Sequence, residues 1–191
     1  MKTPYNARNQ RFSNSAHYAA RKYIYPAIFG TNNLSYTNTL LRQGEKEAIL
    51  DGELGIDRIV KVSSPSFPKG LPFTIQERFR KPKHAKFRDI SIPEWLHKSN
   101  RPGELYKLSA GLFVYGYYDE PKDMFLEVVA VSVIDLMMGL ANGTIKYTKG
   151  TFEDKDQTFI GINFDELKKS GAVRACIKNA GKHEWWKCIK R

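Results

Sequence analysis

The chain has 191 residues, of which 41% are hydrophobic and 27% are charged. These values fit one folded domain with its own core and exclude a largely disordered chain. Lys and Arg number 31 against 20 Asp and Glu, which gives a net charge of +11. This surplus indicates a polyanionic partner, nucleic acid before an anionic membrane surface.

Several other classes of protein are excluded by simple features of the chain. No uncharged apolar run approaches the roughly 20 residues of a membrane-spanning helix, and no apolar secretory signal stands near the start. Cys176 and Cys188 do not form a C-x-x-C unit, so neither a disulfide scaffold nor a structural zinc site is expected. We therefore expect a cytoplasmic protein that does not act in a membrane.

The N-terminal part of the chain is basic and free of acids. Residues 1–44 contain six Lys or Arg, and the first acid is Glu45. We predict that residues 1–14 form a flexible basic arm and that residues 15–191 form a single domain. A serine-capped helix is predicted over residues 16–23, ended by Pro26 and Gly30, followed by a second helix over residues 37–50.

The rest of the chain alternates between strand-like runs and short helices. Ser132 and Asn163 are expected to cap helices over residues 133–141 and 164–170. A long loop over residues 64–72 is expected to join the first two strands as a hairpin. The predicted strands cover residues 56–63, 73–79, 87–92, 111–118, 124–131 and 158–162. This order predicts an α/β fold with a mixed central β-sheet flanked by helices.

The polar residues of the first two predicted strands form the most informative pattern. Asp57 begins one strand, and Gln76 and Arg78 share one face of the next because residues two apart in a strand point the same way. If the two strands are neighbours, these side chains occupy one small volume. Glu47, late on the second predicted helix, can add another carboxylate. The pattern indicates a divalent-metal site beside a cation, as phosphodiester hydrolysis needs.

These residues carry a resemblance to a known superfamily. The run Gly55-Ile56-Asp57 and the run TIQERFR at residues 74–80 resemble the PD-(D/E)XK nucleases, which have the restriction-endonuclease-like fold. The resemblance implies that Asp57 binds Mg²⁺ or Mn²⁺, with Glu47 and Gln76 or Glu77 completing the ligand set. It further implies Mg²⁺-dependent endonuclease or exonuclease cleavage of DNA, with DNA favoured over RNA as the partner and a homodimer as one possible assembly.

The chain departs from the superfamily pattern in the D/E-x-K element. Gln76 stands at the acidic position and Arg78 at the lysine position, whereas a frame that uses Glu77 would put Phe79 at the lysine position. An amide oxygen brings no charge to a metal, and a guanidinium cannot act as a base, although it can stabilise a charged phosphate. The alternative is therefore an inactive nucleic-acid-binding module with the same fold. A basic RNA-binding protein with an unrelated sheet is a third hypothesis.

Two basic segments flank this pattern. Between residues 78 and 88 the chain has six cations and no acid, which predicts a track for a phosphate backbone. The nucleic-acid-binding residues expected there are Arg80, Lys81, Lys83, Lys86 and Arg88. Trp185 and Trp186 lie among lysines near the C-terminus, where packing is favoured over base stacking. The histidines, His17, His84 and His97 among them, have no Ser or Cys partner at a recognisable spacing.

Overall fold

The computed structural model describes residues 7–38, 54–152 and 156–181. Its centre is a six-stranded sheet in which every neighbouring pair is antiparallel except β3 and β6, which are parallel. The predicted α/β fold with a mixed central sheet is therefore confirmed. In spatial order the strands are β1 (Leu34–Asn38), β2 (Arg58–Ser64), β3 (Phe67–Arg80), β6 (Leu112–Asp119), β7 (Met124–Ser132) and β10 (Val173–Gly181).

A second, antiparallel sheet accompanies the first. Part of it comes from the crossover over residues 81–111, which the parallel pairing of β3 and β6 requires. That crossover also holds two 3₁₀ turns, η2 (Pro82–Phe87) and η3 (Glu104–Lys107). In spatial order the strands of the second sheet are β5 (Arg101–Pro102), β4 (Asp89–Leu96), β9 (Gln157–Asn163) and β8 (Thr148–Phe152).

The N-terminal helical segment is longer than the sequence indicated. It runs through α1 (Ala7–Ala19), a π-helical turn η1 (Ala20–Ile24) and α2 (Tyr25–Phe29). The expected arm is therefore helical from Ala7 onward. Pro26 does not end the helix, because it lies in the first turn of α2, where its missing N–H costs nothing. Gly30 ends it at φ 65°, as predicted.

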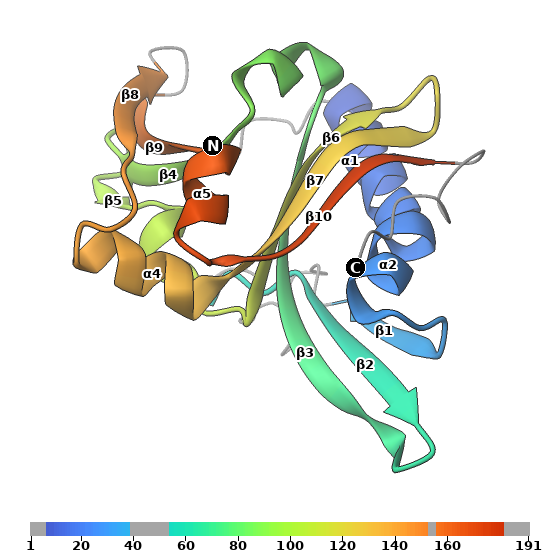
Figure 1. Ribbon diagram of the computed structural model, residues 1–191. Helices are drawn as coiled ribbons and strands as arrows, with labels where there is room; N and C mark the ends of the chain where they lie inside the picture. The colour runs from blue at the N-terminus through green and yellow to red at the C-terminus, as the bar shows by residue number, and fades with distance from the viewer. Residues whose placement is uncertain (1–6, 39–53, 153–155, 182–191) are drawn as a thin grey trace.

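The elements form layers on the two faces of the central sheet (Figure 1). On one face, α1, η1 and α2 bury Ala16, Ile24 and Tyr25 against sheet residues such as Val114 and Val128. The opposite face packs against the second sheet, α4 (Val133–Ala141) and α5 (Phe164–Lys169). In the described part of the chain, no helix is long and apolar enough to cross a membrane.

Of the remaining local predictions, the two helix caps are confirmed, whereas the long hairpin loop and the start of the second helix are not. The Ser132 side chain accepts a hydrogen bond from the Asp135 N–H, and that of Asn163 from the Asp165 N–H, so both predicted helix caps exist. The expected loop over residues 64–72 is wrong: β2 reaches Ser64 and β3 begins at Phe67, so the hairpin has only a tight turn. β1 covers residues 37 and 38, where the helix expected over residues 37–50 was to begin, and residues 39–50 of that helix lie outside the described residues.

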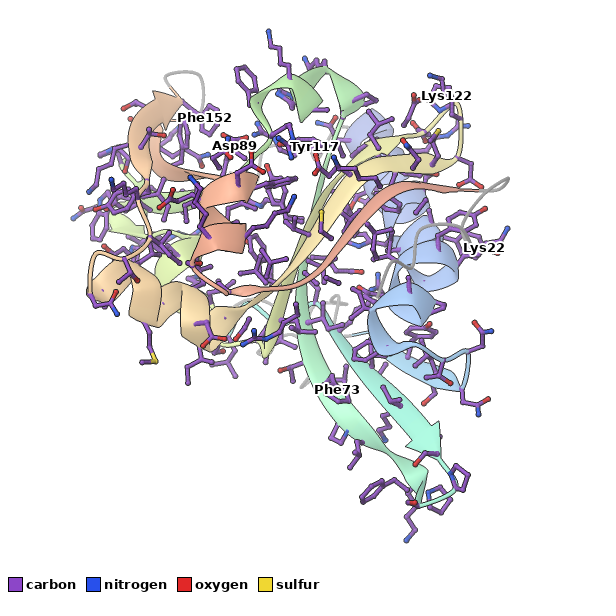
Figure 2. The ribbon with its side chains drawn as sticks, viewed as in Figure 1. Lys22, Phe73, Asp89, Tyr117, Lys122 and Phe152 are labelled. Atoms are coloured by element: carbon purple, nitrogen blue, oxygen red, sulfur yellow. The ribbon has the colours of Figure 1, made fainter. Side chains whose placement is uncertain are left out.

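The β2–β3 hairpin extends beyond the body of the molecule, with Phe73 on it (Figures 1 and 2).

Farther along the chain, a tyrosine hydroxyl joins the two sheets. The Tyr117 O–H on β6 donates to the main-chain oxygen of Asp89 on β4 at 2.7 Å, and the Asp89 N–H donates back to the hydroxyl at 2.9 Å. The two residues lie next to each other in Figure 2. This exchange fixes the start of β4 against the central sheet.

We predict that Tyr117→Phe lowers the free energy of unfolding by about 1–3 kcal/mol, because it removes the hydrogen-bond partner of two partly buried main-chain groups of Asp89. Urea unfolding followed by circular dichroism measures the change. Tyr106→Phe is the control: Tyr106 is 61% exposed, and the same loss of a hydroxyl there should cost less than about 0.5 kcal/mol. Equal effects of the two substitutions would contradict the assignment.

Candidate nucleic-acid interface

A cleft opens beside the last residues of β3, which extend past the first residue of its antiparallel neighbour β2. The first residue of β2, Arg58, pairs with Ile75, so residues 76–80 of β3 have β6 on one side and no continuing β2 on the other. The cleft has a volume of about 560 Å³ and is lined by this part of β3, by α1, by η2 and by the second sheet. That volume is within the range of about 300–1,000 Å³ typical of ligand sites.

The charge of the cleft is strongly positive. Arg78 and Arg80 at the end of β3, with Lys81 and Lys83 directly after it, all line the cleft. The Arg80 guanidinium donates to two neutral groups, the Ser91 hydroxyl at 3.1 Å and the Tyr115 hydroxyl at 3.4 Å. Within the described residues, no carboxylate pairs with Arg80, Lys81 or Lys83. These three charges are therefore available to an anionic ligand.

Arg78 differs from its neighbours because it has a carboxylate partner. Its guanidinium donates to the main-chain oxygen of Ser91 at 3.1 Å and to the Glu104 carboxylate. Glu104 also accepts from the side-chain amide of Gln76 at 3.1 Å. The side-chain oxygen of Gln76 is buried and has no hydrogen-bond partner within the part of the chain that the structure describes. Gln76 and Arg78 thus share a face of β3, as predicted, with Glu104 from the crossover between them.

Asp57 lies at the start of β2 beside β3, also as predicted. Its N–H donates to the oxygen of Ile75 at 2.9 Å, and its carboxylate accepts from the Glu77 N–H at 2.6 Å. The carboxylate therefore satisfies an N–H of β3 at the point where β2 ends. Asp57 is 5% exposed, and the register of β2 and β3 places it beside Gln76.

Glu77 does not join this group, because it lies on the other face of β3. Its side chain is fully buried against the helical layer, where the Tyr25 hydroxyl donates to it. The Arg58 guanidinium donates to it at 2.6 Å, and Nδ1 of His17 lies 2.6 Å from the same carboxylate oxygen. Burial raises the pKa of Glu77, but the contacts with His17 and Arg58 outweigh burial and bring the pKa below the ordinary carboxyl value.

The remaining predicted site residues are scattered. Glu47 lies outside the described residues. The Lys86 ammonium lies over the ring of Phe87, 5.0 Å from its centre, and does not line the cleft. The guanidinium of Arg88 pairs with Glu127 and Asp165, each at 3.1 Å, so its charge is already balanced. Among the described residues, no three His, Cys, Asp or Glu side chains are arranged to hold a metal ion.

Sequence reasoning missed the residues that surround Glu77. Arg58 is only 1% exposed, yet it stands directly after Asp57 and reads as an ordinary surface charge in the sequence. His17 has no Ser or Cys partner at a recognisable spacing in the sequence, and in the structure it lies beside a carboxylate 60 positions away. One signal is present in the sequence: the run QERFR places charged side chains on both faces of a strand, so a strand in the middle of a sheet would bury at least one of these charges.

No family model, curated protein or solved structure matches the chain. The functional argument therefore rests on the geometry of the cleft and on the chemistry of its side chains.

We predict that Glu77→Gln lowers the free energy of unfolding by about 3–5 kcal/mol at neutral pH, because it removes the negative charge that faces the buried Arg58 guanidinium. Since folding lowers the pKa of Glu77, the stabilisation is present above the ordinary carboxyl pKa and is lost as the pH falls below it. Urea unfolding at about pH 6 and about pH 3 should therefore show a smaller pH dependence in the variant than in the wild type.

Glu94→Gln is the matched control, because Glu94 pairs at 2.7 Å with a lysine that is 58% exposed. Loss of such a pair costs about 0–1 kcal/mol. A Glu77→Gln variant as stable as Glu94→Gln would show that the buried contacts contribute little.

Proposed function

We propose that the protein binds nucleic acid by holding the phosphate backbone in the cleft at the end of β3. The observation that carries the proposal is the set of cleft cations, Arg80, Lys81 and Lys83, which have no carboxylate partner among the described residues. Lys and Arg bind phosphates by releasing condensed counterions, which supplies most of the sequence-independent affinity for nucleic acid. The net charge of +11 adds a long-range attraction.

The cleft also offers surfaces for nucleobases. Phe12 of α1 and Phe152 of β8 both line it. The Lys81 ammonium lies 5.7 Å from the centre of the Phe12 ring, and Phe152 stacks on Phe159 with their centres 4.1 Å apart. Bases stack on such rings without sequence preference. Single-stranded nucleic acid, whose bases are free to stack, is the form that suits these surfaces best.

A restriction-endonuclease-like arrangement is part of the proposal. It is supported by Asp57 at the start of β2 and by Gln76 and Arg78 on the adjacent antiparallel strand β3. The mixed sheet with a helical layer on one face is compatible with it. The phosphate-binding residues lie at the end of β3, where a scissile phosphate would lie in that arrangement.

A metal-dependent nuclease is the second candidate function, with Mg²⁺ or Mn²⁺ as cofactor. The observation that favours it is the buried side-chain oxygen of Gln76 beside Asp57, which has no hydrogen-bond partner among residues 7–38, 54–152 and 156–181. The described residues supply only part of a ligand set, because Glu104 is bound to Arg78 and Gln76, and Glu77 lies on the opposite face. We therefore derive no reaction step through a metal ion.

We predict that the protein binds single-stranded oligonucleotides of mixed sequence with an affinity that falls steeply as salt rises. The double variant Lys81→Ala/Lys83→Ala should bind more weakly and lower the slope of log affinity against log salt. Each lost contact to a single strand removes about 0.7 from that slope, so the expected change is about 1.4. Fluorescence anisotropy in the presence of EDTA measures both quantities.

The matched control is Lys61→Ala/Lys69→Ala, which removes the same charge from exposed positions on the β2–β3 hairpin. It should leave the slope nearly unchanged. An affinity that does not respond to salt, or an equal loss in both double variants, would contradict binding in the cleft.

For the second candidate, we predict that Asp57→Asn abolishes any cleavage that needs Mg²⁺ or Mn²⁺ while oligonucleotide binding persists. Asparagine keeps an oxygen that can accept from the Glu77 N–H, so the variant should fold. Asp165→Asn, at an exposed carboxylate of α5, is the control. Labelled single-stranded, duplex and branched DNA are the substrates, and a wild type that binds them without cutting excludes this candidate.

A further inference from the structure

His17 presents one ring nitrogen to the cleft and the other to a buried carboxylate. Its side chain is 14% exposed, Nδ1 lies 2.6 Å from Glu77, and the ring lines the cleft from α1. The ring of Phe79 packs edge-on against it, with the centres 5.5 Å apart. Neither ring nitrogen makes a hydrogen bond among the described residues: Nδ1 is buried within ion-pair distance of the Glu77 carboxylate but is not aligned for a hydrogen bond, and Nε2 has no partner. The imidazole is therefore fixed in its plane with Nε2 as the nitrogen open to a ligand.

Glu77 is suited to support a histidine that takes up a proton. Arg58 and Tyr25 hold its carboxylate in place from two other elements. The low pKa of Glu77 keeps it ionised at neutral pH, with burial opposing this and the contacts with His17 and Arg58 dominating. A carboxylate this close to Nδ1 stabilises, by its charge, the imidazolium that forms when Nε2 accepts a proton.

A second histidine lines the same cleft. His84 belongs to η2, which follows β3 directly, so it approaches from a different element than His17. Arg80 and Lys81, which precede η2 in the chain, line the cleft as well. The cleft thus holds two imidazoles together with cations that can neutralise a phosphate. Cleavage of a phosphodiester by proton transfer needs these groups: a base, an acid and charge stabilisation.

We propose that this cleft cleaves RNA without a metal ion, with His17 as the general base and His84 as the general acid. The inference rests on the proposed binding of a nucleic-acid backbone in the cleft. Nε2 of His17 takes the proton of a ribose 2′-hydroxyl, whose oxygen attacks the adjacent phosphorus. The new bond joins the 2′-oxygen to phosphorus, and the bond from phosphorus to the 5′-oxygen breaks.

The leaving 5′-oxygen takes a proton from the protonated ring of His84. The products are a 2′,3′-cyclic phosphate and a 5′-hydroxyl end, and water returns the proton from His17 to His84. Arg80 and Lys81 hold the non-bridging oxygens while negative charge develops on them. RNA is the substrate because its 2′-hydroxyl is a nucleophile already in place beside the phosphate. DNA lacks that hydroxyl and cannot react by this route.

The test uses the full chain and a single-stranded RNA of mixed sequence, labelled at its 5′ end, in buffer containing EDTA. We expect cleavage that leaves 2′,3′-cyclic phosphate ends, and no cleavage of the DNA of the same sequence. His17→Asn should lower the rate at least about 100-fold, the lower end of what a general base contributes. Asparagine keeps an N–H near Glu77 but cannot take up the proton. His84→Asn should lower the rate similarly.

His97→Asn is the matched control, because His97 is exposed and lies outside the cleft lining; it should cut as fast as the wild type. Since traces of ribonuclease contaminate basic proteins, the variants are purified in parallel with the wild type. Cleavage that persists in His17→Asn, that needs a divalent cation or that attacks DNA equally overturns the inference. So does a wild type that binds the RNA in EDTA but leaves it intact, although the proposed binding function then stands.

A wild type that does not bind RNA or DNA at all would overturn both proposals. If His17→Asn fails to fold, an RNA with 2′-deoxyribose at the main cleavage position replaces it. Cleavage at that position must then disappear while binding by the wild type is retained. Unchanged cleavage there would overturn the mechanism without any variant.

Discussion

The carboxylate of Glu77 is the interaction on which the arrangement of this molecule depends. It accepts contacts from three elements besides its own strand: His17 of α1, Tyr25 of α2 and Arg58 of β2. A buried charge is tolerated only when its partners are in place, and loss of one partner leaves the others unpaired at a high cost. The helical layer is therefore attached to the sheet in one orientation, and the same attachment sets the position of the His17 ring.

The strand β3 gives its two faces different tasks. Ile75 and Phe79 pack with Glu77 toward the helices, while Gln76, Arg78 and Arg80 face the second sheet. Because β2 ends beside residue 75, the last part of β3 has an open side from which both faces can be reached. The cleft follows from this geometry. If another strand were paired along this side of β3, it would separate His17 of α1 from Arg80 of β3, and the two side chains could not line the same space.

The parts of the fold that sequence could predict are those fixed by neighbours in the chain. Ser132 and Asn163 cap their helices through residues two or three positions away, and β6 and β7 are joined by a short hairpin. Asp57 beside Gln76 was also predictable, because consecutive strands tend to pair. The second sheet was not, because β4 pairs with β9 across more than sixty residues of chain. The environment of Glu77 was hidden for the same reason: nothing local distinguishes His17 or Arg58 from a solvated charge.

The crossover between β3 and β6 also has a consequence for how the molecule folds. The crossover carries η2 and β4, which form walls of the cleft. The main pairing partner of β4 in the second sheet is β9, which lies far along the chain. Closing such a large loop costs entropy before any contact repays it, so pairings of this kind tend to form late. The cleft would then be assembled last, so that a partly folded chain carries the positive charge of the finished protein without its binding geometry.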